Sequence, residues 1–216
     1  SDIQIRSFFK IIFISIFLLF IYLVIKNKSF TEISLMSVAF NVISILTGTG
    51  YVTEDFSNWG NFPLLFFLIL MFIGGCAGST TGGIKVFRFQ ILFKYINLHL
   101  KKMLKPHSVV VSHFNNKKVT ESTYESVMTF FFLYILTFSV SALLLSFSGL
   151  DFLTCISGAA SAISNVGPGL GNTIGPDGYY GELNSYSKII LISTMFLGRL
   201  EMLTILILLI PSFWKD

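Results

Sequence analysis

The stretch Ile33–Tyr51, which reads ISLMSVAFNVISILTGTGY, is an apolar segment followed at once by a loop with two glycines. The apolar part, Ile33–Leu46, is too short to cross a hydrocarbon core of about 30 Å, which takes about 20 helical residues. Its length fits a re-entrant helix that enters a membrane and ends inside it. The loop Thr47–Gly50 would then lie at membrane depth, where irregular backbone persists only if protein or water surrounds it.

The composition of the chain favours a membrane setting for this segment. The 216 residues are 53% hydrophobic and 12% charged, with a mean hydropathy of +0.77. Soluble domains carry about 25% charged residues, so an ordinary soluble domain is excluded. The 2 cysteines, Cys76 and Cys155, are too few for a disulfide framework and lack the spacing of a metal site. The sequence therefore predicts an all-α integral membrane protein.

Longer apolar stretches on both sides of this segment can cross a membrane as helices. They are Phe8–Ile25, Phe62–Ile84, Ser126–Leu150 and Ser187–Pro211. A second short stretch, Phe152–Ile163, has about the length of Ile33–Leu46 and is expected to be re-entrant as well. The expected architecture is four spans with two re-entrant pore loops.

The basic residues lie mostly on one side of these spans, which predicts that this side is cytoplasmic. Residues 85–118, between the second and third spans, hold eight basic residues and no acid. Both chain ends share this side, so both are expected in the cytoplasm, and both short segments are expected to enter from outside. The basic stretch is expected to be a solvated loop near anionic lipid, and no nucleic-acid partner is expected.

The chain aligns with itself at a shift of 117 residues. The first span then falls on the third, and Ile33–Leu46 falls on Leu150–Ile163. The loop Thr47–Gly50 falls on Ser164-Asn165-Val166-Gly167. Each half therefore reads span, short helix, glycine-containing loop, span, which predicts one repeat in residues 1–117 and another in residues 118–216.

Helix-start signals stand before both short helices. Ser29-Phe30-Thr31-Glu32 fits a capping box, and Asp151 suits the positive end of the second helix. The C-terminal end of each helix, with about half a negative charge, would then point to the middle of the membrane, where a cation is favoured.

The two glycine-containing loops are therefore expected to be pore loops. Glycine allows backbone conformations that turn carbonyls toward an axis, and a ring of carbonyls can replace the hydration shell of K⁺. The string TGTGY is close to the potassium-filter string TVGYG. A membrane turn without an ion role is the alternative for one such loop alone. The expected ion-filter residues are Thr47, Gly48, Thr49, Gly50, Ser164, Asn165, Val166 and Gly167.

A glycine cluster, Gly74–Gly83, interrupts the second apolar stretch with five glycines. Each glycine costs a helix about 1 kcal/mol relative to alanine, so the span is expected to break there beside a cavity. The alternative is a tight helix-packing site made of small residues. A phosphate-binding P-loop is excluded because Ile84 stands where its lysine should be.

Arg199 lies about twelve residues into the fourth span. A charge at that depth costs about 3 kcal/mol unless it is partnered, and Glu201 points to a different helix face. We expect Arg199 to face the pore and to bond carbonyls of the Gly74–Gly83 loop, holding it closed. The alternative is an ion pair with Glu121 or Glu125.

Three motifs of the chain resemble the TrkH/KtrB potassium-uptake proteins, and TrkH more closely than KtrB. They are GGCAGSTTGGIK at Gly74–Lys85, NVGPGLG at Asn165–Gly171, and GRLE at Gly198–Glu201 with the closing PSFW at Pro211–Trp214. They occur in the order of the family and cover essentially the whole chain. The family has four repeats around one pore, so the resemblance implies that this chain is a C-terminal half with repeats three and four. The N-terminal half of the subunit would be its partner, and a half-ring of two loops is not expected to conduct alone.

The resemblance implies a protein of the cell membrane that takes up K⁺ and is not an enzyme. K⁺ would be the cargo, with no cofactor in this chain, and Gly50 and Gly167 fit a preference for K⁺. Further implied partners are a second copy in a homodimer, a cytosolic nucleotide-binding regulatory subunit and the lipid bilayer. The glycine loop would be the gate, with residues Gly74, Gly75, Gly78, Ser79, Thr80, Gly82 and Gly83, and with Arg199 beside it.

Other functions stay open from the sequence. A Na⁺-conducting relative differs from a K⁺ transporter in the first repeat, which is not part of this chain. A membrane scaffold without transport would not need Gly50 or Gly167. A membrane enzyme would need paired acid and base groups inside the spans, where only Arg199 and Glu201 occur.

Overall fold

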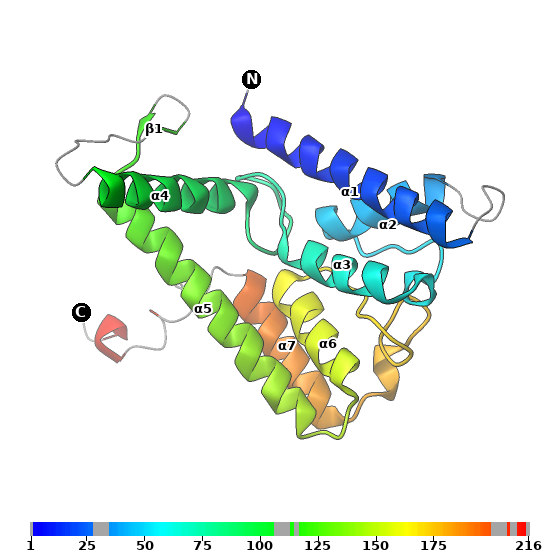
Figure 1. The fold of residues 1–216 in the computed structure, drawn as a ribbon. Helices are drawn as coiled ribbons and strands as arrows, with labels where there is room; N and C mark the ends of the chain where they lie inside the picture. The colour runs from blue at the N-terminus through cyan, green and yellow to red at the C-terminus, as the bar shows by residue number, and fades with distance from the viewer. Residues whose placement is uncertain are drawn as a thin grey trace.

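The computed structural model describes residues 2–27, 35–105, 113–114, 117–199, 207 and 211–214. Regular structure in these residues is helical except for one antiparallel pair of two-residue strands, β1 (His113–Phe114) and β2 (Lys117–Lys118) (Figure 1). This pair lies in the basic stretch that was expected to be a loop. The all-α class is confirmed for the described residues apart from the strand pair.

Within the described part of the chain, two helices are long and apolar enough to cross a membrane, α1 (Ile3–Asn27) and α5 (Glu121–Ser146). They correspond to the first and third predicted spans, although α5 begins five residues before its predicted start and ends four before its predicted end. The side chains of Phe9, Phe13 and Phe17 on α1 are more than half exposed, which suits contact with lipid.

Two short helices, α2 (Leu35–Thr47) and α6 (Phe152–Ser164), match the predicted re-entrant segments to within two residues. The Asp151 carboxylate accepts a hydrogen bond from the Thr154 N–H at 3.1 Å, as its position before α6 predicts. The expected capping box at Ser29–Glu32 lies outside the described residues. Ten of the 13 residues of α6 are buried, because α3, α5 and α7 all pack against it.

The second predicted span breaks at the glycine cluster, as its composition predicts. Helix α3 (Asn61–Phe72) ends before the cluster, and α4 (Val86–Leu104) begins after it and packs on α5. The loop between them returns to its starting point, because the Gly74 N–H donates to the Ile84 carbonyl and the Ile84 N–H donates to the Phe72 carbonyl, both at 2.9 Å. The alternative of a helix-packing stripe is therefore wrong, since these glycines lie outside any helix.

Helix α7 (Ser185–Arg199) is the described part of the fourth predicted span. Glu201 and most of the remainder of that span lie outside the described residues, which resume at Ile207 and at the 3-10 turn η3 (Pro211–Trp214). Helix α7 packs on α5 and α6 (Figure 1). A buried hydrogen bond of 2.8 Å joins the hydroxyls of Ser141 on α5 and Thr194 on α7.

The two halves of the chain share a core. The 3-10 turn η1 (Phe56–Trp59) places Phe56 against Phe67 of α3, with ring centroids 4.3 Å apart and both side chains fully buried. The same apolar cluster takes in Val166 and Leu170 from the second half. The segment after α2 is therefore held against the segment after α6.

We predict that Gly198→Ala destabilises the protein by about 1–3 kcal/mol, the usual cost of overpacking a core. A methyl group at Gly198 would overlap the backbone carbonyl of Ile163, so α6 and α7 would have to separate. The control is Gly158→Ala, because the nearest atom to its added methyl is the flexible Cδ1 of Ile174, at 3.0 Å. Thermal unfolding in detergent should show the larger loss for Gly198→Ala, and equal losses would contradict the tight contact between α6 and α7.

Candidate functional site

Helices α2 and α6 end in the same turn. Two backbone hydrogen bonds close each helix end, and in each case the corresponding residues differ by 117 positions. In the first half they join the Gly48 N–H to the Ile45 carbonyl (3.2 Å) and the Thr49 N–H to the Ser44 carbonyl (3.1 Å). In the second half they join the Asn165 N–H to the Ala162 carbonyl (3.1 Å) and the Val166 N–H to the Ser161 carbonyl (3.0 Å).

A left-handed residue makes this turn possible in both halves. Gly48 has a φ of 66°, and Asn165 at the corresponding position has a φ of 53°. Asparagine is one of the few residues other than glycine that adopts this conformation readily. The Asn165 amide also donates to the carbonyl of Met195 at 3.1 Å, which ties the second loop to α7.

The two loops lie against each other at Gly50 and Gly167. A Cβ on Gly167 would lie 3.5 Å from the Cα of Gly50, and a Cβ on Gly50 would overlap the Val166 carbonyl. The structure therefore brings the predicted filter segments Thr47–Gly50 and Ser164–Gly167 together, although they are far apart in the sequence. The ligands available here are backbone carbonyls and hydroxyls.

The glycine loop lies against the ends of both short helices. A Cβ on Gly82 would overlap the Ser164 carbonyl, and the Gly82 nitrogen lies 4.0 Å from where a Cβ of Gly48 would be. Gly74 and Gly75 at the start of the loop are buried, whereas Gly78, Ser79 and Thr80 at its tip are exposed. The predicted gate residues therefore form one loop in contact with the predicted filter residues.

Lys85 holds the glycine loop in shape. Its ammonium group donates to the Ser79 carbonyl at 2.9 Å, to the Thr81 hydroxyl at 3.0 Å, and to the Thr81 carbonyl. The Thr81 hydroxyl in turn accepts from the Gly75 N–H at 2.9 Å. In the sequence Lys85 counts as one of the basic residues on the cytoplasmic side and as the last residue of the Gly74–Lys85 motif, so its hydrogen bonds to the loop were missed. The available signal was its place two residues after Gly83.

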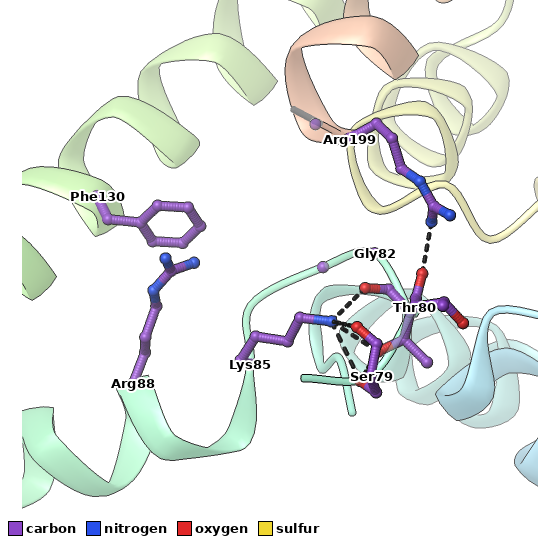
Figure 2. A pocket seen from close by; sticks show the side chains of 10 residues that line it. Ser79, Thr80, Gly82, Lys85, Arg88, Phe130 and Arg199 are labelled. Carbon is purple, nitrogen blue, oxygen red and sulfur yellow. Dashed lines mark hydrogen bonds between the residues drawn. The ribbon is translucent and has the colours of Figure 1, made fainter. Parts of the chain in front are cut away.

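Arg199 reaches the tip of the same loop from the end of α7. Figure 2 shows its guanidinium pointing at the loop, where Nη1 donates to the Thr80 carbonyl at 2.5 Å. This is the contact that the sequence predicts. The alternative partners, Glu121 and Glu125, lie at the start of α5, where Tyr124 packs on Tyr95 at the middle of α4.

A cavity of about 270 Å³ lies between the loop, α4 and α7. Lys85, Arg88 and Arg199 all line it, and the Arg88 guanidinium stands 3.6 Å above the ring of Phe130 (Figure 2). A cation that passed the loop into this cavity would meet three positively charged side chains.

Serine and tyrosine hydroxyls support the loop Ser164–Gly167, and most of them have no feature in the sequence that selects them. Ser161 bonds both the N–H and the carbonyl of Gly167, and Tyr180 donates to the same carbonyl. Tyr134 on α5 shares a buried hydrogen bond of 2.6 Å with Ser164. One signal was available, because Ser44 and Ser161 are both serine and correspond under the shift of 117 residues.

Residues 3–215 match the model of a protein family named TrkH and described as "Cation transport protein". The chain belongs to the TrkH family. Its membership makes it a membrane-embedded chain, in agreement with α1 and α5.

Named relatives of this TrkH-family chain come from several bacteria. The Trk system potassium uptake protein TrkI of Halomonas elongata is 46% identical over 183 residues, which cover 85% of this chain and 37% of the relative. The Trk system potassium uptake protein TrkH of Vibrio parahaemolyticus is 36% identical over 220 residues, which cover 100% of this chain and 44% of the relative.

The fold of the TrkH-family chain matches a solved structure. The crystal structure of the potassium transporter TrkH from Vibrio parahaemolyticus superposes with a TM-score of 0.87 at 35% identity, and the match covers 99% of this chain and 45% of that one. This TrkH-family chain therefore spans less than half the length of the relatives it matches.

We predict that Asn165→Ala destabilises this TrkH-family chain more than Asn165→Gly does. Both variants lose the hydrogen bond to Met195, worth about 0.6 kcal/mol on average in a membrane protein. Only the alanine variant adds the strain of a left-handed residue, about 1–2 kcal/mol. Thermal unfolding in detergent measures the difference, and an alanine variant as stable as the glycine variant would contradict the left-handed turn.

Proposed function

We propose that this chain forms two of four pore-loop repeats around a K⁺ pathway in a potassium-uptake subunit. The observation that carries the proposal is the pair of helix-ending turns, with the same hydrogen bonds 117 residues apart and with their loops in contact at Gly50 and Gly167. The proposed repeats are residues 1–117 and 118–216. The names of the relatives, which are potassium uptake proteins, support K⁺ as the cargo.

The proposed conduction step is the replacement of water around K⁺ by protein oxygen atoms. The C-terminal ends of α2 and α6 lie directly before the two loops, so their partial negative charges favour a cation there. Carbonyls of Thr47–Gly50 and Ser164–Gly167 would supply half of the ring, and two further repeats of the subunit would supply the other half. No covalent bond forms or breaks in this process.

The glycine loop, Gly74–Gly83, is the proposed gate below these carbonyls. Its contact with Ser164, its bond to Arg199 and the three cationic side chains of the adjoining cavity all oppose the passage of K⁺ in this arrangement. Opening requires the loop tip to leave Arg199. Glycine-rich backbone suits such a movement because it adopts many conformations without strain.

The proposed setting is the cell membrane, with both ends of this segment in the cytoplasm and the basic α4 on that side. We propose that the other half of the subunit, a second copy of the subunit and a cytosolic nucleotide-binding regulator complete the assembly. The relatives are named as members of a Trk system, which supports a multi-component assembly.

We predict that Gly50→Ser and Gly167→Ser, each made in the full-length protein, lower the rate of K⁺ uptake about tenfold or more, which corresponds to about 1.4 kcal/mol at the filter. A side chain at Gly50 would overlap Val166, and Gly167 has a φ of 119°. The measurement is ⁸⁶Rb⁺ uptake and growth at low K⁺ in cells that lack other uptake systems.

The control for both glycine variants is Gly149→Ser. Gly149 also has a positive φ, 75°, but a Cβ there would have nothing within 4 Å. The variant Gly149→Ser therefore adds backbone strain without disturbing the contact between the two loops. If growth at low K⁺ survives Gly50→Ser and Gly167→Ser unchanged, the chain is a membrane scaffold and the proposed function is wrong.

We predict that Arg199→Ala in the full-length protein raises K⁺ flux in the resting state about tenfold or more. A hydrogen bond from a charged donor is worth about 1.5–3 kcal/mol, and Arg199 donates one to the loop in the closed arrangement. The control is Arg6→Ala, which removes an exposed positive charge from α1. Flux measured in proteoliposomes decides the question, and unchanged flux and gating would contradict the role of Arg199.

A further inference from the structure

The carbonyl of Gly167 accepts two hydrogen bonds from side chains. Tyr180, in the 3-10 turn η2 (Tyr180–Glu182), donates its hydroxyl at 2.8 Å. Ser161 of α6, whose side chain is 2% exposed, donates its hydroxyl at 2.9 Å and accepts from the Gly167 N–H at 3.1 Å. A carbonyl oxygen has two lone pairs, so both are engaged.

The preceding carbonyls of the same loop point in a different direction. The Val166 carbonyl lies against Gly50 of the other loop, and the Asn165 carbonyl lies 3.7 Å from where a Cβ of Gly48 would be. These two oxygen atoms therefore face the neighbouring filter loop, whereas the Gly167 oxygen faces Ser161 and Tyr180. The φ of 119° at Gly167, which side chains disfavour, accompanies this change of direction.

We propose that Tyr180 and Ser161 are positioning residues that hold the Gly167 carbonyl away from the ion. In this arrangement the loop Ser164–Gly167 coordinates K⁺ through the carbonyls of Ser164, Asn165 and Val166, and Gly167 supplies the turn rather than a ligand. The proposal rests on the proposed function of the loops as an ion filter. It amends the sequence-based expectation, and with it the proposed conduction step, because the Gly167 carbonyl is then not itself a ligand of the ion.

These two hydrogen bonds fix the shape of the loop Ser164–Gly167, and the loop Thr47–Gly50 does not have the same pair of bonds. Under the shift of 117 residues Ser161 corresponds to Ser44, but Tyr180 corresponds to Pro63, which has no hydroxyl. The Ser44 hydroxyl accepts a hydrogen bond from the Thr49 side chain at 3.1 Å. A fixed loop sets the number and the spacing of the carbonyls that face the ion, and K⁺ selectivity depends on the carbonyls that replace the hydration shell.

The test is Tyr180→Phe in the full-length protein, which keeps the ring and removes only the hydroxyl. We expect the ratio of K⁺ to Na⁺ uptake in proteoliposomes to fall about threefold or more, the effect of one hydrogen bond in a membrane protein. A ratio does not depend on how much protein is present, so a modest loss of abundance leaves the result readable. Ser161→Ala, which frees the same carbonyl, should lower the ratio in the same direction.

The matched controls remove hydroxyls that do not touch the loop. Tyr179→Phe changes the neighbouring tyrosine, which is 70% exposed, and Ser193→Ala removes a hydroxyl that bonds the Ile189 carbonyl of its own helix at 2.9 Å. Both controls should keep the wild-type ratio. If wild-type protein takes up K⁺ and Tyr180→Phe keeps its ratio, the positioning role is wrong while the proposed function stands. If wild-type protein takes up no K⁺, both are wrong.

Discussion

Peptide groups that leave a helix inside a membrane must find hydrogen-bond partners within the protein, and three segments of this chain depend on that constraint. The loop after α2 is closed by the Ser44 carbonyl, and the loop after α6 is closed by the Ser161 carbonyl. The glycine loop is closed by Lys85 and Thr81. Because these partners are supplied locally, the remaining carbonyls of the loops can face a shared axis.

The two halves meet this constraint in the same way at the helix ends and in different ways beyond them. Gly48 and Asn165 make the same left-handed turn, but only Asn165 adds a side-chain bond to α7. Downstream, the Asn41 side chain accepts from the Thr53 N–H at 3.1 Å, whereas the Ser157 hydroxyl accepts from the Leu170 N–H at 2.9 Å. Thr53 and Leu170 correspond under the shift of 117 residues, so the anchored position is kept while the anchoring side chain changes.

Much of this arrangement could be predicted from the sequence, because its signals are local. The lengths of α2 and α6, the break after Phe72 and the left-handed position at Gly48 all follow from apolar length and glycine placement. The bond from Arg199 to the glycine loop could be expected because a charge within an apolar span needs a partner.

The contacts that could not be predicted from the sequence are hydrogen bonds from residues that belong to no motif to carbonyls or hydroxyls many positions away. Tyr180 lies 13 residues after Gly167, and Tyr134 lies 30 residues before Ser164. Neither has a motif, since a single hydroxyl carries no spacing signal until the fold brings it to a carbonyl. Lys85 was misjudged for a different reason, because it begins the basic stretch and was grouped with those charges, although its place two residues after Gly83 sets it apart from them.

The most direct test of the central claim, that K⁺ passes between the two loops, is to locate the ion. Crystals of the full-length protein grown with Rb⁺ or Tl⁺ in place of K⁺ would show bound ions by their anomalous scattering. An anomalous peak between Thr47–Gly50 and Ser164–Val166, within coordination distance of their carbonyls, is the predicted result. Occupied ion sites elsewhere in the membrane region with no peak between these loops would contradict the claim.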